Sequence, residues 1–206
     1  MVLKDKKILF LHIPKTAGQS ITRFLMENEN EPYSLKNSKF GLIYNNKSKL
    51  KGPKHYHHLH LQEYQTLNIV DNLQDYFKFT VFRNPYSRFI SAFKFNQSQH
   101  NYDSYKDFIK YFSNKKFSKK EVMFRHFIPQ TWYIDYNIDN IDQYFFQERL
   151  NELETFFFKK FNFTKKIGHE NISKKQTKDL DNYTKDFIKD FYKKDFKILG
   201  YKYETP

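Results

Sequence analysis

Two stretches of this chain share one pattern, an apolar run followed by a short loop and an amphipathic helix. Residues 7–13 form the first apolar run, and residues 77–82 form a second run rich in residues that favour strands. After the first loop, Ile21, Phe24 and Leu25 recur at helical spacing. A strand, loop and helix that occur twice predict an α/β fold with a mostly parallel central sheet flanked by helices.

The second loop carries its own helix-start signal. Asn84 is a residue type that caps helices, and Pro85 suits a first helical turn. Phe89, Ile90 and Phe93 then give that helix an apolar stripe. Both loops also contain basic residues.

The rest of the chain predicts mainly helices, and its length of 206 residues favours one domain over residues 1–206. The expected helices span residues 105–112, 119–127, 147–161 and 183–196. We expect irregular structure over residues 28–54, with a short hairpin near 40–43, a solvated loop over 114–120 and a short final strand over 197–203.

Composition limits the chemistry that is possible. Aromatic residues make up 20% of the chain, which supplies a core although hydrophobic residues reach only 39%. There is no cysteine, so disulfides, thiolate zinc sites and a cysteine nucleophile are excluded. The start of the chain is charged and its apolar run is short, so we expect a soluble, cytoplasmic protein with no targeting segment and no membrane span.

The net charge of +13 is unevenly distributed. Residues 36–62 contain six lysines and no carboxylate, residues 76–102 contain four Lys or Arg and no carboxylate, and residues 135–154 contain six acids and one base. Such segregation suits an anionic ligand such as a nucleotide, an acidic polysaccharide or a nucleic acid. A merely solubilising surface explains the composition equally well.

The first loop, residues 12–20 with the sequence HIPKTAGQS, has the parts of a phosphate cradle. A helix N-terminus offers unpaired N–H groups and a partial positive charge. Gly18 permits close backbone approach, Thr16 and Ser20 add hydroxyls, and Lys15 adds a full charge. The glycine spacing differs from that of a Walker A loop, which disfavours an NTPase of that type.

The second loop, residues 82–93 with the sequence FRNPYSRFISAF, places Arg83 at a strand end and Ser91 two turns into a helix. These two side chains are able to hold a terminal phosphate. A nucleotide kinase would want an acid near that strand end to bind magnesium, and the sequence there contains none.

Together, the two loops resemble the cofactor motifs of sulfotransferases that use 3'-phosphoadenosine 5'-phosphosulfate, in the carbohydrate branch that includes heparan 2-O-sulfotransferase and the chondroitin and dermatan sulfotransferases. Weaker likenesses occur at residues 58–61, 127–130 and 195–201. The resemblance implies a P-loop-like nucleotide-binding fold, 3',5'-ADP as product, and Arg83 and Ser91 as ligands of the 3'-phosphate. It also implies that the 5'-phosphosulfate is held by the first loop, namely Pro14, Lys15, Thr16, Ala17, Gly18, Gln19 and Ser20.

Sulfuryl transfer requires an acceptor hydroxyl in line with a departing phosphate oxygen, together with a base. Lys15 suits the charge that builds on the leaving oxygen, and we expect no metal ion. The base is sought at residues 55–60, because histidine titrates near neutrality. The resemblance favours His58, with His60 second. Three alternatives remain for this tract: a zinc site, contact with the acceptor, and an exposed polar loop.

The sequence also singles out four other residues. His12 is expected to be a core histidine, and Trp132 and Tyr133 are more typical of a core than of a stacking platform. Arg88 is expected to reach either a phosphate or a surface carboxylate.

The expected function is transfer of a sulfuryl group to a hydroxyl, on a carbohydrate or another hydroxyl acceptor that an anionic group would suit, with no nucleic acid partner. The rivals are a non-catalytic basic module that binds a heparin-like polymer or nucleic acid, and a small-molecule kinase.

Overall fold

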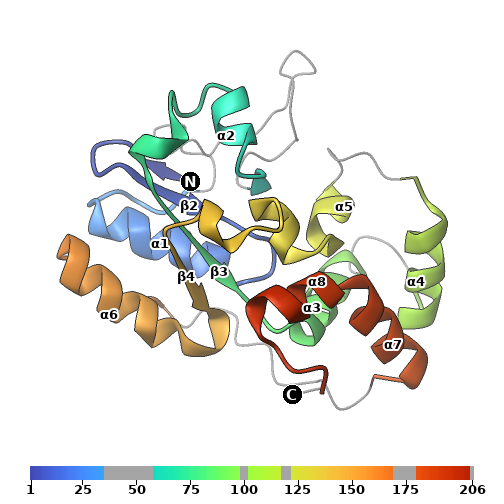
Figure 1. The fold of residues 1–206 in the computed structure, drawn as a ribbon. Helices are drawn as coiled ribbons and strands as arrows, with labels where there is room; N and C mark the ends of the chain where they lie inside the picture. The colour runs from blue at the N-terminus through green and yellow to red at the C-terminus, as the bar shows by residue number, and fades with distance from the viewer. Residues whose placement is uncertain (35–57, 98–101, 117–121, 169–179, 205–206) are drawn as a thin grey trace.

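The computed structural model describes residues 1–34, 58–97, 102–116, 122–168 and 180–204. Its centre is a four-stranded sheet in the order β1-β2-β3-β4, in which β1 is antiparallel to β2 and the other neighbours are parallel (Figure 1). The strands are β1 (Val2–Leu3), β2 (Ile8–Leu11), β3 (Phe77–Phe82) and β4 (Gln143–Phe146). The mostly parallel sheet and the strands at β2 and β3 confirm the prediction, whereas β1 and β4 were not predicted.

The register brings the carboxyl ends of three strands to one edge of the sheet. Leu11 pairs with Thr80, and Phe82 pairs with Phe146. The segments that follow β2, β3 and β4 therefore leave the sheet at the same edge, which is where ligands bind in open α/β sheets.

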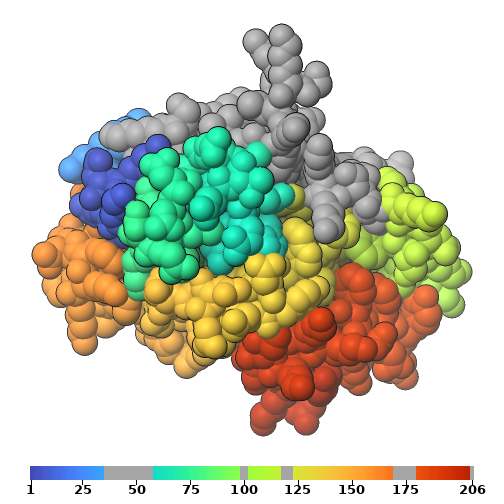
Figure 2. Space-filling model, turned by 45° about the horizontal axis from the view of Figure 1, so that its top comes forward, coloured from blue at the N-terminus to red at the C-terminus, as the bar shows by residue number. Residues whose placement is uncertain are grey.

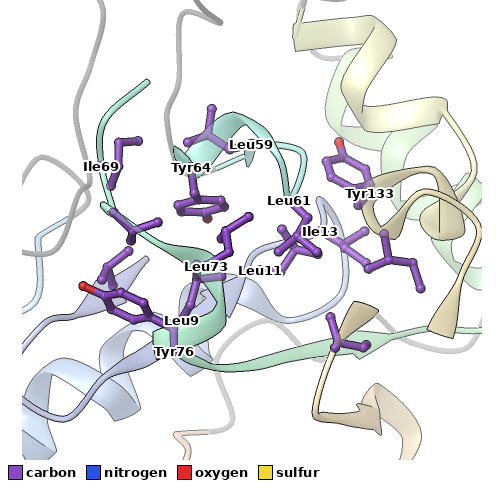
Figure 3. Packing of buried hydrophobic residues seen from close by; sticks show 14 of the residues in the cluster. Leu9, Leu11, Ile13, Leu59, Leu61, Tyr64, Ile69, Leu73, Tyr76 and Tyr133 are labelled. Atoms are coloured by element: carbon purple, nitrogen blue, oxygen red, sulfur yellow. The ribbon is translucent and has the colours of Figure 1, made fainter. Parts of the chain in front are cut away.

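The two faces of the sheet bury alternate side chains, as expected of a strand period of two. Ile8 and Phe10 pack with residues of α1 (Gly18–Asn28) and α6 (Leu150–Phe161). Leu9 and Leu11 pack instead against Leu59, Leu61, Tyr64 and Leu73, from the segment that contains α2 (Glu63–Thr66) and the 3-10 helix η3 (Leu73–Asp75) (Figure 3).

A third group of helices surrounds an aromatic cluster beside the sheet. Its elements are α3 (Pro85–Gln97), α4 (Tyr105–Asn114), α5 (Val122–Phe127), α7 (Asn182–Phe191) and α8 (Lys193–Leu199). The rings of Phe108 and Phe127 lie 4.4 Å apart between centroids, and those of Phe89 and Phe127 lie 5.6 Å apart. A core built largely from rings accounts for the aromatic content of the sequence.

The segment between α5 and α6 crosses the middle of the molecule. It contains the 3-10 helices η4 (Gln130–Ile134), η5 (Ile138–Asn140) and η6 (Gln147–Arg149) as well as β4. Figure 2 shows this segment in yellow between α6 in orange and the C-terminal helices in red.

Some expectations from the sequence differ from the structure. The helix expected over residues 183–196 is two helices, α7 and α8, and the strand expected over 197–203 is wrong. Phe196 and Leu199 are both buried at helical spacing, and Gly200 ends α8 with φ of 70°. The expected hairpin near residues 40–43 lies outside the described residues. Within the described residues, no helix combines the length and apolarity that a membrane crossing requires.

Candidate functional site

The first loop joins β2 to α1 with an unusual backbone. Lys15 and Ala17 both adopt left-handed conformations, with φ of 69° and 65°. Thr16 Oγ1 donates to the carbonyl of Ile13 at 2.9 Å, so this hydroxyl supports the loop itself. Ala17 occupies the N-cap position of α1 without any side-chain cap, and the first turn of α1 contains no acid. The positive end of α1 is therefore uncompensated.

Gly18 leaves room for the ring of His12. A Cβ at Gly18 would lie 1.8 Å from Nε2 of His12, so only glycine allows that ring to sit there. His12 is buried, as expected, and its ring stacks on Phe10 with 5.6 Å between centroids. The close backbone approach predicted at Gly18 is thus made by the His12 ring.

The second loop joins β3 to α3 and has a capped helix. Oδ1 of Asn84 accepts from the backbone N–H groups of Tyr86 at 3.0 Å and Ser87 at 3.3 Å, which confirms the predicted cap. Ser91 is half-buried on α3. The guanidinium of Arg83 reaches across to the first loop, where NH1 donates to the carbonyl of Lys15 at 3.2 Å. The structure therefore brings the two predicted loops together.

Two cations meet at this contact. Burial lowers the pKa of Lys15, and the neighbouring charge of Arg83 lowers it further. Burial also lowers the pKa of Arg83; Glu148 opposes that shift, and the charge of Arg88 adds to it. Two partly buried cations side by side favour an anion, because an anion would relieve both the repulsion and the lost hydration.

Glu148 corrects one expectation about the end of β3. Its Oε1 accepts from the backbone N–H of Asn84 at 2.8 Å, and its Oε2 accepts from the hydroxyl of Tyr201 at 3.1 Å. An acid is therefore present beside the second loop, although the sequence near Arg83 contains none. Glu148 follows β4, and the unpredicted pairing of β4 with β3 explains why it was missed.

The ammonium group of Lys15 rests on an aromatic ring. Its Nζ lies 4.4 Å from the centroid of Phe95, whose side chain is 40% exposed. The Phe95 ring also meets the ring of His126 edge-on, with 4.9 Å between centroids. Neither Phe95 nor His126 was singled out from the sequence, because both face the first loop from α3 and α5.

His58 lies beside the start of the first loop. Its Nδ1 is 3.3 Å from the backbone oxygen of His12, and its ring lies 4.7 Å from that of His12 and 5.4 Å from that of His126. A carbonyl oxygen only accepts, so this contact makes Nδ1 the protonated nitrogen and Nε2 the basic one. A proton on Nδ1 is what a general base acting at Nε2 requires.

His60 has different surroundings. Its Nε2 pairs with Asp135 at 2.9 Å, and its Nδ1 accepts from the backbone N–H of Gln62 at 3.2 Å. Burial lowers the pKa of His60 and outweighs the opposing effects of Asp135 and Glu63. Both ring nitrogens of His60 thus serve contacts within the protein.

Residues 58–60 form no strand. His55 and His57 lie outside the described residues, which leaves the zinc alternative for the whole tract without a test. Among the residues that the structure describes, no three His, Asp or Glu side chains gather as metal ligands would.

Arg125 fixes the backbone of the histidine segment. Its NH1 donates to the carbonyl of His58 at 2.7 Å, and its guanidinium binds both carboxylate oxygens of Glu63 at 2.7 Å. Glu63 in turn accepts from the backbone N–H of His60 at 2.7 Å. More than 60 residues separate Arg125 from His58 and from Glu63 in sequence, so no local pattern predicted these contacts.

Arg88 is buried and binds backbone carbonyls. It is 1% exposed, and it donates through Nε to the carbonyl of Pro14 at 3.0 Å and through NH1 to that of Ile128 at 2.9 Å. The expectation of a surface carboxylate is therefore wrong, because Arg88 is a buried link to the first loop. Tyr133 is a core residue as expected, and Trp132 packs on the ring of His60.

Comparison with known proteins adds one finding. The sequence model of a family described as "Sulfotransferase family" matches residues 1–202, a span that includes both loops. No curated protein and no solved structure matches the chain.

Proposed function

Because this chain belongs to the sulfotransferase family, we propose that it transfers a sulfuryl group from 3'-phosphoadenosine 5'-phosphosulfate to a carbohydrate hydroxyl, leaving 3',5'-ADP. The observation that carries the proposal is the contact between the two loops, in which Arg83 donates to the carbonyl of Lys15 at 3.2 Å. This contact holds two cationic sites next to each other, as a nucleotide with phosphates at both ends of its ribose requires. The carbohydrate acceptor is supported by the resemblance of both motifs to the carbohydrate branch.

The residues of both loops fit such a donor. The first N–H groups of α1 lack a side-chain cap and Lys15 adds a charge, so this loop would hold the 5'-phosphosulfate. Arg83 and Ser91 would hold the 3'-phosphate. The bound donor would supply an activated sulfuryl group attached to a phosphate oxygen.

The proposed reaction is one in-line displacement. Nε2 of His58 takes the proton of the acceptor hydroxyl while the hydroxyl oxygen bonds to sulfur, and the bond between sulfur and the phosphate oxygen breaks. Lys15 leaves the Phe95 ring and stabilises the negative charge that develops on the departing oxygen. Arg125 keeps His58 in place by donating a hydrogen bond to the backbone carbonyl of His58.

A binding module would account for the basic composition but gives no reason for the contact between the loops. A kinase would use Glu148, whose two carboxylate oxygens already accept from Asn84 and Tyr201. The geometry therefore favours the transferase over both rivals.

Transfer from a radiolabelled donor tests the proposal. The purified chain is incubated with sulfur-labelled 3'-phosphoadenosine 5'-phosphosulfate and panels of neutral, uronate-containing and sulfated glycans, and in parallel with phosphorus-labelled ATP. Label from the sulfate donor should enter at least one glycan, and phosphate should enter none. The Lys15→Ala variant controls for contaminating enzymes. Phosphate transfer, or binding of glycans without any sulfate transfer, would contradict the proposal.

A further inference from the structure

The side chain of Gln130 makes the hydrogen bonds to the Arg83 backbone that a neighbouring strand would otherwise make. The backbone N–H of Arg83 donates to Oε1 of Gln130 at 2.8 Å, and Nε2 of Gln130 donates to the Arg83 carbonyl at 2.8 Å. One fully buried side chain thus binds both polar groups of the Arg83 backbone.

The Gln130 amide binds Arg83 just past the end of β3. The last pair between β3 and β4 is Phe82 with Phe146, so the sheet ladder stops one residue before Arg83. Backbone groups at such a partly buried position still need partners, and Gln130 supplies them. Fixing the backbone of Arg83 also fixes the direction in which its side chain leaves the sheet.

Asp195 holds Gln130 in turn. This carboxylate is fully buried in α8, and it accepts from the backbone N–H of Gln130 at 2.8 Å and of Thr131 at 2.9 Å, and from the Thr131 hydroxyl at 2.7 Å. These bonds anchor the start of η4, and Nε2 of Gln130 itself also donates to Oδ2 of Asp195 at 3.5 Å, so the same carboxylate contacts the amide that faces Arg83. The weak likenesses at residues 127–130 and 195–201 in the sequence thereby meet in one network.

The same segment is tied to the first loop. Arg88 joins the carbonyl of Ile128, two residues before Gln130, to the carbonyl of Pro14. Residues 128–130 therefore bind the second loop directly and are linked to the first loop through Arg88, although they do not lie in either loop.

We propose that Gln130 is a positioning residue that aims Arg83 at the 3'-phosphate and so sets the selectivity for a 3'-phosphorylated nucleotide. This inference rests on the proposed function, because it assumes that Arg83 meets that phosphate. A purely structural role for Gln130 predicts lower stability with unchanged selectivity, and the test must separate the two roles.

The test compares two nucleotides on the Gln130→Met variant, which keeps the side-chain length and removes the amide. Dissociation constants for 3',5'-ADP and 5'-AMP are measured by titration calorimetry. Affinity for 3',5'-ADP should fall about tenfold, the scale expected for two lost hydrogen bonds, while affinity for 5'-AMP stays unchanged. The matched control is Asn140→Leu, which removes an amide that donates to the Ile134 carbonyl of η4 at 2.9 Å and should change neither affinity.

A double-mutant cycle completes the experiment. In an Arg83→Met background, the further change Gln130→Met should leave the ratio of the two affinities unchanged, because Gln130 acts only through Arg83. If Gln130→Met does not fold, Gln130→Asn replaces it, since the shorter amide cannot span both contacts and should show the same loss.

The outcomes separate this inference from the proposed function. A wild-type protein that prefers 3',5'-ADP, with a variant that prefers it equally, overturns the role of Gln130 alone. A wild-type protein without that preference overturns both the inference and the proposed donor. A selectivity loss confined to the Arg83-containing background supports the inference.

Discussion

The two loops at the carboxyl edge of the sheet differ in whether a side chain caps the helix that follows. In the first loop, Ala17 leaves the start of α1 without a side-chain cap, and both Lys15 and Ala17 have left-handed backbones. In the second loop, Asn84 caps α3, and Arg83 projects a guanidinium. The first loop thus offers backbone N–H groups to a ligand, and the second offers side chains.

The difference shows which loop depends on the other. Left-handed non-glycine residues cost about 1–2 kcal/mol each, and an absent cap costs about 1 kcal/mol. The second unit supports the first, since Arg83 donates to the carbonyl of Lys15 and Arg88 to that of Pro14. We infer that the strained loop holds the reacting end of the donor and that the capped, rigid loop holds its other end.

The largest expected effect concerns His58, which is attached to the start of the first loop through the carbonyl of His12. His58→Ala should lower kcat by about a hundredfold to ten-thousandfold, the range for loss of a general base. Its affinity for 3',5'-ADP should stay the same. His60→Ala is the matched control and should retain most of its turnover. Loss of turnover in His60→Ala alone would make His60 the base instead.

The next effect concerns Lys15, the cation of the first loop. Lys15→Met should lower kcat by about a hundredfold to a thousandfold, because it removes one preorganised charge from the leaving oxygen. Lys94→Met, an exposed lysine of the last turn of α3, controls for general loss of charge. Steady-state kinetics check this, and a change in KM with kcat intact would assign Lys15 to binding only.

Substitutions at the two helix starts should change the free energy of unfolding in opposite directions. Asn84→Ala should lower the free energy of unfolding by about 1 kcal/mol, because two N–H groups lose their acceptor. Ala17→Gly should raise it by about 1 kcal/mol, because glycine adopts φ of 65° without strain. Urea unfolding measures both. Equal signs for the two variants would contradict the contrast between the loops.

The smallest effect is a pH dependence that belongs to His60. Its folded pKa is lowered from the ordinary 6.5 by burial. Between these two values the unfolded chain binds a proton that the folded chain does not, so stability falls as the pH drops below about 6.5. His60→Gln should reduce that acid-side slope, measured by thermal unfolding between pH 5 and 7 (about the range in which histidine titrates). An unchanged slope would mean that other groups cause it.

Local patterns predicted the parts of this fold that are themselves local. The apolar runs at β2 and β3, the Asn84 cap and the apolar stripe of α3 each follow from neighbouring residues, and the structure confirms them. The strand β4 was missed because only Phe145 of its four residues is buried and because the strand lies in an acid-rich segment. The expected strand after residue 196 failed because the buried side chains there follow a helical spacing.

For the site, the sequence predicted which residues come after each strand but not what holds them. Arg125 and Gln130 bind backbone carbonyls of His58 and Arg83, and such contacts leave no trace in residue spacing. Glu148 lies at the site because it follows β4, a strand that was not predicted. The sequence also did not predict that the His12 ring is the neighbour that needs the missing Cβ of Gly18. Candidate side chains can be predicted from motifs, whereas their orientation depends on long-range hydrogen bonds.

The central claim is that the two loops hold two phosphates of one nucleotide, and thermal unfolding with three nucleotides tests it most directly. At about a hundred times its dissociation constant, 3',5'-ADP should stabilise the chain by about 2.7 kcal/mol. At the same concentration 5'-AMP and 3'-AMP should each do much less, because each would contact only one loop. Equal shifts for 3',5'-ADP and 5'-AMP would contradict the claim.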